Sequence, residues 1–329
     1  SFACIWGTSL AQANACLSVA MAISFGFLVS VCIRRVWTTL LMIVGLAAVQ
    51  ALFALLDYHQ GMHVVRSGNL LRTLGSFDNT GQIVLLLVLS FSIILVLGYR
   101  FTNKYVAPAL GFVGAVIFAA LIITWSRNGV IIAGLSTTFI VYRVTRDKKN
   151  VIISGAIAAI LICSVFVARL NGTTNGASTS RSTVGRLFVA QKAFAQAAKS
   201  NFLGVGPSNV ELSIAWPSPM APGRPSEEDL LDPRSLPLLW MMEFGILGLV
   251  LFVLLSWHVC KVVKDSFTAE GTAVGVCWLV ILGLGLADVT FGITYTQPGN
   301  YLLGIFVGIT LTLSTLRSAQ NDPKTPAAS

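Results

Sequence analysis

The sequence predicts an all-α, polytopic membrane protein, and three observations support that fold class. Hydrophobic residues make up 55% of the 329 residues, charged residues make up only 11%, and the mean hydropathy is +0.80. A soluble domain carries about 25% charged residues. The apolar residues also fall into runs of about 20, the length that crosses a bilayer as a helix. Together these values exclude a soluble globular enzyme.

About nine apolar runs are long enough, or nearly long enough, to span a membrane. The fifth run is short, and it is bounded by Arg127 and Arg143, whose side chains can snorkel toward the membrane surface. We place the spans at residues 13–33, 36–56, 81–99, 105–124, 128–142, 151–168, 237–257, 272–292 and 300–316.

Lys and Arg residues in the short connections predict the orientation of the spans. Most of these basic residues fall in every second connection, and we expect those connections and the C-terminus to be cytoplasmic. The basic residues concerned are Arg34, Arg35, Arg100, Lys104, Arg143, Arg146, Lys148, Lys149, Lys261, Lys264, Arg317 and Lys324. The connections at 57–80 and 169–236 then lie outside. The net charge of +9 therefore indicates topology and anion contacts rather than a nucleic-acid surface.

The same count puts the first residue outside, without a recognisable signal sequence. We therefore expect the numbered chain to lack N-terminal helices of a longer protein. Residues 1–329 form a single transmembrane domain in this interpretation.

The external loop at 169–236 is expected to carry function, because loops of this length rarely occur without one. Within it, residues 186–202 are predicted to form an amphipathic helix, with Phe194 on its apolar face and Lys199 on its polar face. Such a helix is suited to lying in the membrane interface rather than crossing it.

Neither a metal site nor a cofactor is expected. The six cysteines fall in or beside apolar runs and show no CxxC spacing, and the chain has only three histidines. The Walker phosphate-binding pattern is also absent from the sequence, which argues against an ATP-driven machine.

Arginines on the predicted outer side need a reason other than topology. Arg66 and Arg72 lie in the 57–80 connection, and Arg127 lies at the membrane edge between two spans. An arginine in such a place needs carboxylate, phosphate or carbonyl partners. An anionic ligand, a lipid headgroup and a structural ion pair remain open for these arginines. Glu243 and Asp288 lie within spans, where they serve either a function or pairing with the outer arginines.

Short motifs follow one another around the outer side, from about residue 60 to about residue 250. In order they are Arg66 followed by Arg72-Thr-Leu-Gly-Ser-Phe, Trp125-Ser-Arg-Asn-Gly, Gly185-Arg186, Asn201-Phe-Leu-Gly-Val-Gly-Pro-Ser-Asn and Glu243-Phe-Gly-Ile-Leu-Gly. This ordered set resembles the O-antigen ligase and O-antigen polymerase superfamily, which also contains exopolysaccharide polymerases and O-linked protein oligosaccharyltransferases.

The resemblance implies an inverting, metal-independent glycosyltransferase of the bacterial inner membrane that acts on the extracytoplasmic face. The implied donor is a glycan on undecaprenyl diphosphate, and the acceptor is a glycan, a lipid or a protein. A departing diphosphate gains negative charge, and the planar fork of arginine suits its oxygens. By position, Arg127 and Arg186 are the implied main diphosphate ligands, followed by Arg66 and Arg72.

One position departs from the family pattern. Ligases of this kind place a histidine about nine residues before the glutamate of Glu-x-Gly-x-x-Gly, where this chain has Arg234 and Ser235. Either another residue serves as the base, or Arg234 adds a further phosphate contact. The departure favours a polymerase or a divergent member over a lipid A core ligase. The candidates for the general base are Glu243, Asp288, His59 and His63.

Two other functional classes remain open. In a secondary transporter or lipid-linked substrate flippase, Glu243 and Asp288 would be coupling groups, although no inverted repeat is evident. In a non-catalytic membrane subunit, the fold of the ligase would be retained beside a membrane protein partner.

Overall fold

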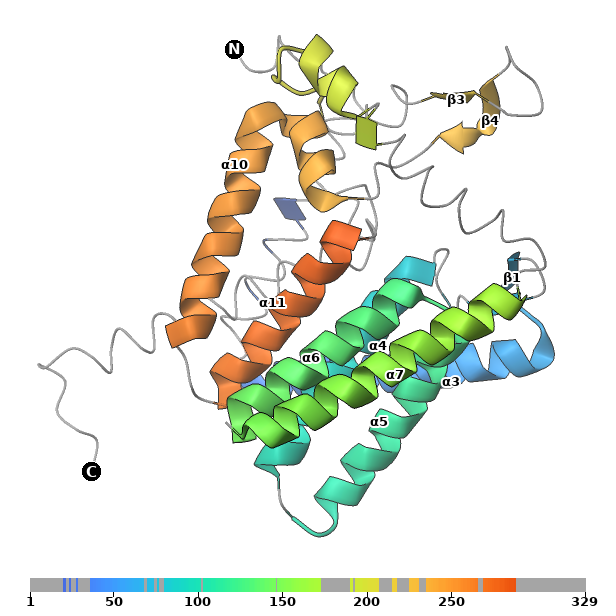
Figure 1. Ribbon diagram of the computed structural model, residues 1–329, viewed down its shortest axis with the longest axis vertical. Helices are drawn as coiled ribbons and strands as arrows, with labels where there is room; N and C mark the ends of the chain where they lie inside the picture. The colour runs from blue at the N-terminus through green and yellow to red at the C-terminus, as the bar shows by residue number, and fades with distance from the viewer. Residues whose placement is uncertain are drawn as a thin grey trace, which may run out of the picture.

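The computed structural model of the chain describes residues 20–21, 24, 28, 36–67, 70–73, 76, 80–101, 103–145, 147–172, 190–191, 193–206, 215–217, 225–230, 235–265 and 269–287. Its helices are α3 (Val36–Gln60), α4 (Thr80–Arg100), α5 (Val106–Ile123), α6 (Arg127–Thr145), α7 (Lys148–Gly172), α10 (Leu236–Asp265) and α11 (Ala269–Ala287) (Figure 1). Two short antiparallel hairpins complete this part, β1 (Val64–Ser67) with β2 (Leu70–Thr73) and β3 (Ala215–Pro217) with β4 (Pro225–Leu230).

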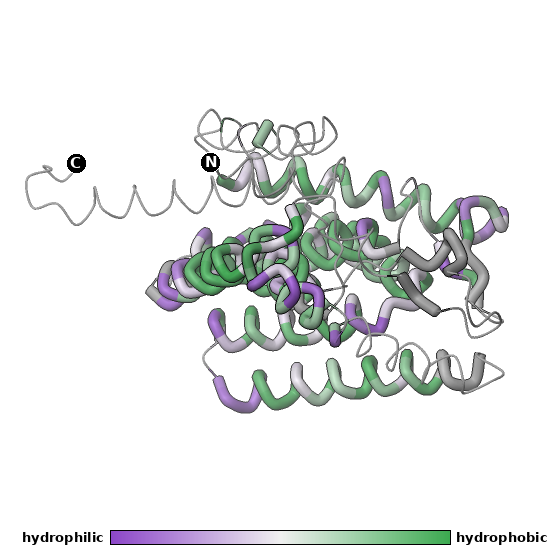
Figure 2. The backbone as a smooth tube through the Cα atoms, turned by 90° about the horizontal axis from the view of Figure 1, so that it is seen from above, coloured by the Kyte–Doolittle hydropathy of each residue, from purple (hydrophilic) through white to green (hydrophobic). Residues whose placement is uncertain are grey.

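Five of the described helices are long and apolar enough to cross a membrane, and α11 contributes a shorter apolar segment. This mostly helical architecture supports the predicted polytopic membrane protein. The helix bodies are hydrophobic and the hydrophilic positions gather toward helix ends (Figure 2). The predicted span at 300–316 and nearly all of the span at 13–33 lie outside the described residues.

Helix α4 forms the centre of the bundle. Its sequence is apolar on every side, which is typical of a helix enclosed by others. It packs against α3, α5, α6 and α11, and 78% of its apolar window is buried. The Ser90 and Ser92 hydroxyls, both buried, donate to the carbonyl oxygens of Ile43 and Val88 at 3.4 and 2.8 Å, so neither hydroxyl is left without an acceptor.

Helix α7 has the opposite surroundings. Only 6% of its apolar window is buried, and it packs along α6. The pair approaches closely because α6 has glycine at 134, where an added Cβ atom would stand 2.9 Å from the Cβ of Ala158. The remaining surface of α7 is apolar and exposed, as expected for a helix that faces lipid.

Helix α6 begins and ends slightly outside the predicted span of 128–142. It carries several hydroxyl residues, and the hydroxyls of its three threonines at 137, 138 and 145 donate to carbonyls of their own helix, for example Thr138 to Gly134 at 3.0 Å. A hydroxyl bonded in this way can lie in an apolar layer without an external partner. Helix α6 therefore joins the bundle although it is less hydrophobic than its neighbours.

The ends of α3, α4 and α11 meet at one end of the bundle. The Trp37 indole N–H donates to Glu270 Oε1 at 2.6 Å, and the Arg100 guanidinium pairs with the same oxygen. Arg100 also lies over the Trp37 ring, 4.5 Å from its centroid.

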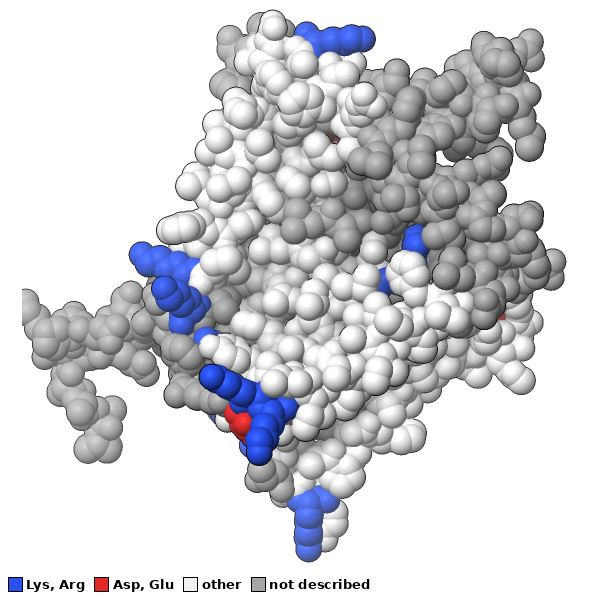
Figure 3. Space-filling model, viewed as in Figure 1, with Lys and Arg blue, Asp and Glu red and all other residues white. Residues whose placement is uncertain are grey.

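Most of the visible basic side chains gather at this end of the bundle, around the termini of α6, α7 and α10 (Figure 3). In the described part of the chain, the basic connections from α4 to α5, from α6 to α7 and from α10 to α11 thus share one end of the bundle.

Candidate functional site

The turn between α5 and α6 is built by the Thr124-Trp-Ser-Arg-Asn-Gly motif. The Thr124 hydroxyl donates to Leu121 O at 2.7 Å, which closes α5. Trp125 then has a φ of 51°, a left-handed conformation that is uncommon for a large side chain. The Ser126 hydroxyl accepts the Gly129 N–H at 3.2 Å, so it caps the start of α6.

Gly129 allows α6 to approach the central helix. A Cβ atom added at this position would lie 2.6 Å from Val84 Cγ1 and 3.1 Å from Leu121 Cδ1. Both neighbours belong to the buried core, so neither can give way freely. The glycine of this motif therefore has a packing role that fixes where the motif's arginine stands.

Arg127 is the first residue of α6. The positive end of a helix dipole favours anions, so a cation in the first turn is unfavourable unless a negative group is also near. Its guanidinium lies over the ring of Phe166 on α7, 5.2 Å from the centroid. This contact holds the cation beside the membrane-facing side of the bundle at the end opposite to Glu270.

Arg72 is brought to the same turn by the first hairpin. Strand β2 contacts α3 and α5, and the Arg72 Nε atom donates to Thr124 O at 3.0 Å. Arg72 therefore reaches the turn between α5 and α6, where Arg127 also lies, although the two arginines are 55 positions apart in the sequence. Basic side chains border the described surface near the start of α6 in Figure 3.

Arg66 does not share this placement. The hairpin pairs Arg66 with Leu71 and Val65 with Arg72. Directly opposite residues of an antiparallel pair occupy one face, so position 66 lies on the other face of the hairpin from position 72. The structure describes only the backbone of Arg66.

A second arrangement forms where the segment 193–206 meets α10. Helix α10 is interrupted at Gly245, which has a φ of 70° and a ψ of −154°, and its two parts fold back on one another (Figure 1). The Ile246 N–H donates to Phe202 O at 2.8 Å, while the N–H groups of Val205 and Gly206 donate to Met242 O and Glu243 O at 2.7 and 3.1 Å. The Asn201-Phe-Leu-Gly-Val-Gly motif and the Glu-x-Gly-x-x-Gly motif are therefore bonded backbone to backbone.

Two glycines make this contact possible. A Cβ atom at Gly204 would lie 2.5 Å from Glu243 O, and one at Gly245 would lie 2.1 Å from Phe202 O. Asn201 and Phe202 themselves have positive φ values of 52° and 58°. Strained backbone of this kind persists only where the surroundings enforce it, and it clusters at functional sites.

The break changes the interpretation of the span predicted at 237–257. The part of α10 after Gly245 runs over 246–265, which at 1.5 Å per residue is about 30 Å and matches the hydrocarbon thickness. The shorter first part turns back beside it, and Trp240 meets Phe252 with ring centroids 5.9 Å apart. Carbonyl groups freed at such a break need new donors, and the segment 202–206 supplies them.

The predicted interfacial helix at 186–202 is described from residue 190, without residue 192. Ala193 and Ala197 are its buried positions, whereas Phe194 is 55% exposed and packs edge to face against Phe202 at 5.7 Å. The predicted apolar face thus includes a side chain that does not enter the protein core.

The acid and base candidates occupy different environments. Glu243 is 1% exposed and lies in the turn of α10 that the segment 202–206 covers. His63 is exposed, and its Nδ1 atom lies 3.6 Å from Asp57 Oδ2 at the end of α3. His59 is exposed on the last turn of α3. Arg186, Arg234 and Asp288 lie outside the described residues.

No group of three His, Cys, Asp or Glu side chains within the described ranges is placed to hold a metal ion. The structure adds two participants that the sequence analysis missed, Phe166 beneath Arg127 and Asp57 beside His63. Phe166 has no sequence signal, because an aromatic residue in an apolar run looks like any other. Asp57 had one, since it is an acid at the end of a span.

A family model described as O-antigen ligase matches residues 112–253. This match supports the resemblance to the O-antigen ligase and polymerase superfamily that the motifs indicate. The match extends from the first half of α5 to the second part of α10, so it includes both the turn of Arg127 and the break at Gly245. Comparison with curated proteins and with solved structures finds no match.

The matched segment is similar to a family of glycan-transferring membrane proteins. Arg72, His59, His63 and Asp288 lie outside the matched segment, whereas Arg127 and Glu243 lie within it. The placement of Arg72 at the Thr124 carbonyl is therefore an observation independent of the family match.

Proposed function

We propose that this O-antigen ligase homologue transfers or polymerises glycan from an undecaprenyl diphosphate donor on the extracytoplasmic face, without a metal and with inversion. The observation that supports the proposal most is the convergence of Arg72 on the turn that carries Arg127. Two guanidinium groups there, at the positive end of α6, form a surface suited to a diphosphate.

In the proposed reaction, an acceptor hydroxyl attacks the anomeric carbon from the face opposite to the carrier. The anomeric C–O bond breaks and its electron pair stays on the departing undecaprenyl diphosphate. Arg127 and Arg72 stabilise that charge, with Arg186, Arg66 and Arg234 as further proposed ligands. Fixed cations are effective because they need no reorganisation as the charge develops. The proton of the hydroxyl passes to a general base.

Glu243 and His63 are the base candidates that the geometry favours, and His59 and Asp288 remain proposed candidates. Glu243 is supported by its burial beside the break of α10, where the Gly206 N–H donates to its backbone carbonyl. His63 is supported by Asp57, since a carboxylate beside one ring nitrogen orients the other toward a substrate.

The test uses purified protein in proteoliposomes with a carrier-linked glycan and a hydroxyl acceptor. Arg127→Ala is expected to lower the transfer rate by about 10²- to 10³-fold, the usual effect of removing one charge-stabilising donor. Arg143→Ala is the matched control, because Arg143 lies in the last turn of the same helix, at the end opposite to Arg127. Equal rates for wild type and Arg127→Ala, at equal membrane insertion, would refute the proposal.

The same assay separates the base candidates and tests metal independence. Glu243→Gln and His63→Gln are compared, and the essential base is the one whose loss flattens the pH profile of the rate. Transfer is expected to survive chelation with EDTA unchanged. A product that retains the anomeric configuration by NMR would contradict the inverting mechanism.

A secondary transporter of lipid-linked glycan is the second candidate function, because interrupted helices often line transport sites. The break of α10 at Gly245 is the observation that favours it. Flux of a lipid-linked glycan across proteoliposomes, coupled to a proton or sodium gradient and without glycan transfer, would establish this function instead.

A further inference from the structure

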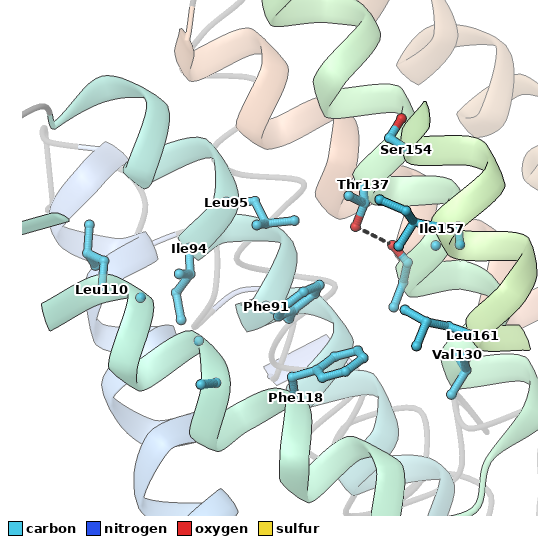
Figure 4. A pocket seen from close by; sticks show the side chains of 16 residues that line it. Phe91, Ile94, Leu95, Leu110, Phe118, Val130, Thr137, Ser154, Ile157 and Leu161 are labelled. Atoms are coloured by element: carbon cyan, nitrogen blue, oxygen red, sulfur yellow. Dashed lines mark hydrogen bonds between the residues drawn. The ribbon is translucent and has the colours of Figure 1, made fainter. Parts of the chain in front are cut away.

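An apolar groove of about 420 Å³ lies between α5 and α7, with α4 and α6 behind it (Figure 4). Leu95 and Phe118 face Ile157 and Leu161 across it, and Leu110 also lines it. Helix α7 packs on α6 while α5 packs on α3 and α4, so the two walls of the groove are joined through the contact between α4 and α6.

The polar groups of the groove are already satisfied. The Thr137 hydroxyl donates to Ala133 O at 2.8 Å, and the Ser154 hydroxyl donates to Val151 O at 2.9 Å. Both hydroxyls therefore turn to their own helices, and the remaining lining is hydrocarbon. A ligand of this groove must itself be apolar, because a polar one would lose water without gaining partners.

The width of the groove depends on small residues of α5. A Cβ atom added at Gly111 would have no atom within 4 Å, so this glycine faces open space. Gly114, one turn further, instead lets α5 approach α4, since its Cβ atom would lie 3.2 Å from Ile94 Cγ2. The space beside Gly111 is thus not filled by the described neighbours.

The groove begins one turn below the proposed diphosphate site. Val130 lines it three residues after Arg127, and Leu161 lines it on the α7 wall that also carries Phe166. From Val130 to Thr137 the groove follows α6 for about 10 Å. It therefore leads from the cation at one end of α6 into the apolar layer.

We infer that this groove holds the first isoprene units of the carrier lipid while its diphosphate lies at Arg127. This inference rests on the proposed function. A water molecule takes up about 30 Å³ in the liquid and a methylene group is of similar size, so 420 Å³ accommodates about 14 carbon atoms, or about three isoprene units. Arg127 near one end of the apolar groove suits a ligand that has an anionic head group and a single hydrocarbon chain.

The experiment is photolabelling of the full chain in proteoliposomes with undecaprenyl diphosphate that carries a diazirine in its third isoprene unit. Labelled peptides from α5 and α7 are expected. Gly111→Leu fills the groove and is expected to reduce this labelling by about tenfold or more, because the space for about one isoprene unit is lost. Gly155→Leu is the matched control, since Gly155 also has no atom within 4 Å of an added Cβ but does not line the groove.

Labelling that Gly111→Leu leaves unchanged would overturn the inference. Equal labelling of the groove by a phosphatidylglycerol with a diazirine in its acyl chain would also overturn it, because the groove would then bind ordinary bilayer lipid. A groove labelled by the carrier in a protein that transfers no glycan under any condition would refute the proposed function alone.

Discussion

Replacement of Gly245 by alanine is expected to detach the segment 202–206 from α10. The new Cβ atom would lie 2.1 Å from Phe202 O, whereas carbon and oxygen normally stay more than 3 Å apart. Relief of this overlap moves the two segments apart by about 1 Å, which stretches the Ile246 to Phe202 hydrogen bond beyond its useful range.

The size of the effect follows from the contacts that are lost. Three backbone hydrogen bonds join the segments, each worth about 1 kcal/mol, and alanine at a φ of 70° adds about 1 kcal/mol of strain. The sum of about 4 kcal/mol corresponds to about a thousandfold more frequent opening of the contact.

Hydrogen exchange of the Val205, Gly206 and Ile246 amides measures this opening directly. Their protection in Gly245→Ala is expected to fall toward that of exposed amides, while α4 keeps its protection. Gly155→Ala is the control, because an added Cβ there meets open space. Unchanged protection of the three amides in a correctly inserted Gly245→Ala protein would refute the reasoning.

Three further predictions concern the two ends of the bundle. Gly129→Ala is expected to destabilise the protein by about 1–3 kcal/mol, because its Cβ meets Val84 in a packed core, and thermal unfolding in detergent measures the change. Phe166→Leu removes the ring beneath Arg127, so donor affinity is expected to fall a few-fold, in line with about 0.5–1 kcal/mol for a cation over a ring, with a smaller effect on kcat. Glu270→Gln breaks a partly exposed ion pair, and a loss of only about 0.5 kcal/mol is expected in the same unfolding assay.

Each of these has an outcome that contradicts it. An unfolding temperature of Gly129→Ala equal to that of Gly45→Ala, where nothing lies within 4 Å, would mean that α6 can shift without cost. A Phe166→Leu protein with unaltered donor affinity would show that the ring does not position the cation. A Glu270→Gln protein that fails to insert would assign this carboxylate a larger role than an exposed ion pair.

The helices were predictable where hydrophobicity alone decides them. Predicted spans at 36–56, 81–99, 105–124 and 151–168 correspond to α3, α4, α5 and α7, because a bilayer accepts a continuous apolar run only as a helix. The resemblance to the O-antigen ligase superfamily, which the family match supports, was also predictable, because the short motifs follow one another in order along the chain.

The interruption of α10 was not predictable from hydrophobicity. The apolar window of α10 is as hydrophobic as those of the unbroken helices, and the break depends on hydrogen bonds with a segment about 40 positions earlier. The anchoring of Arg72 to the Thr124 carbonyl is likewise a long-range contact without a local pattern. Sequence reasoning identified the arginine as unusual, but only the fold shows which connection it reaches.

The cluster of Trp37, Arg100 and Glu270 has a consequence for biogenesis. Arg100 leaves the ribosome 170 residues before its partner Glu270. At a synthesis rate of about 5–20 residues per second, Glu270 of α11 is synthesised roughly 10–30 s after the end of the central helix α4. During that interval the face of α4 that α11 later covers is open to lipid or to an insertion chaperone. Final assembly of the bundle is therefore a late event in synthesis, and a nascent chain that stalls before α11 would remain in the membrane as an open intermediate.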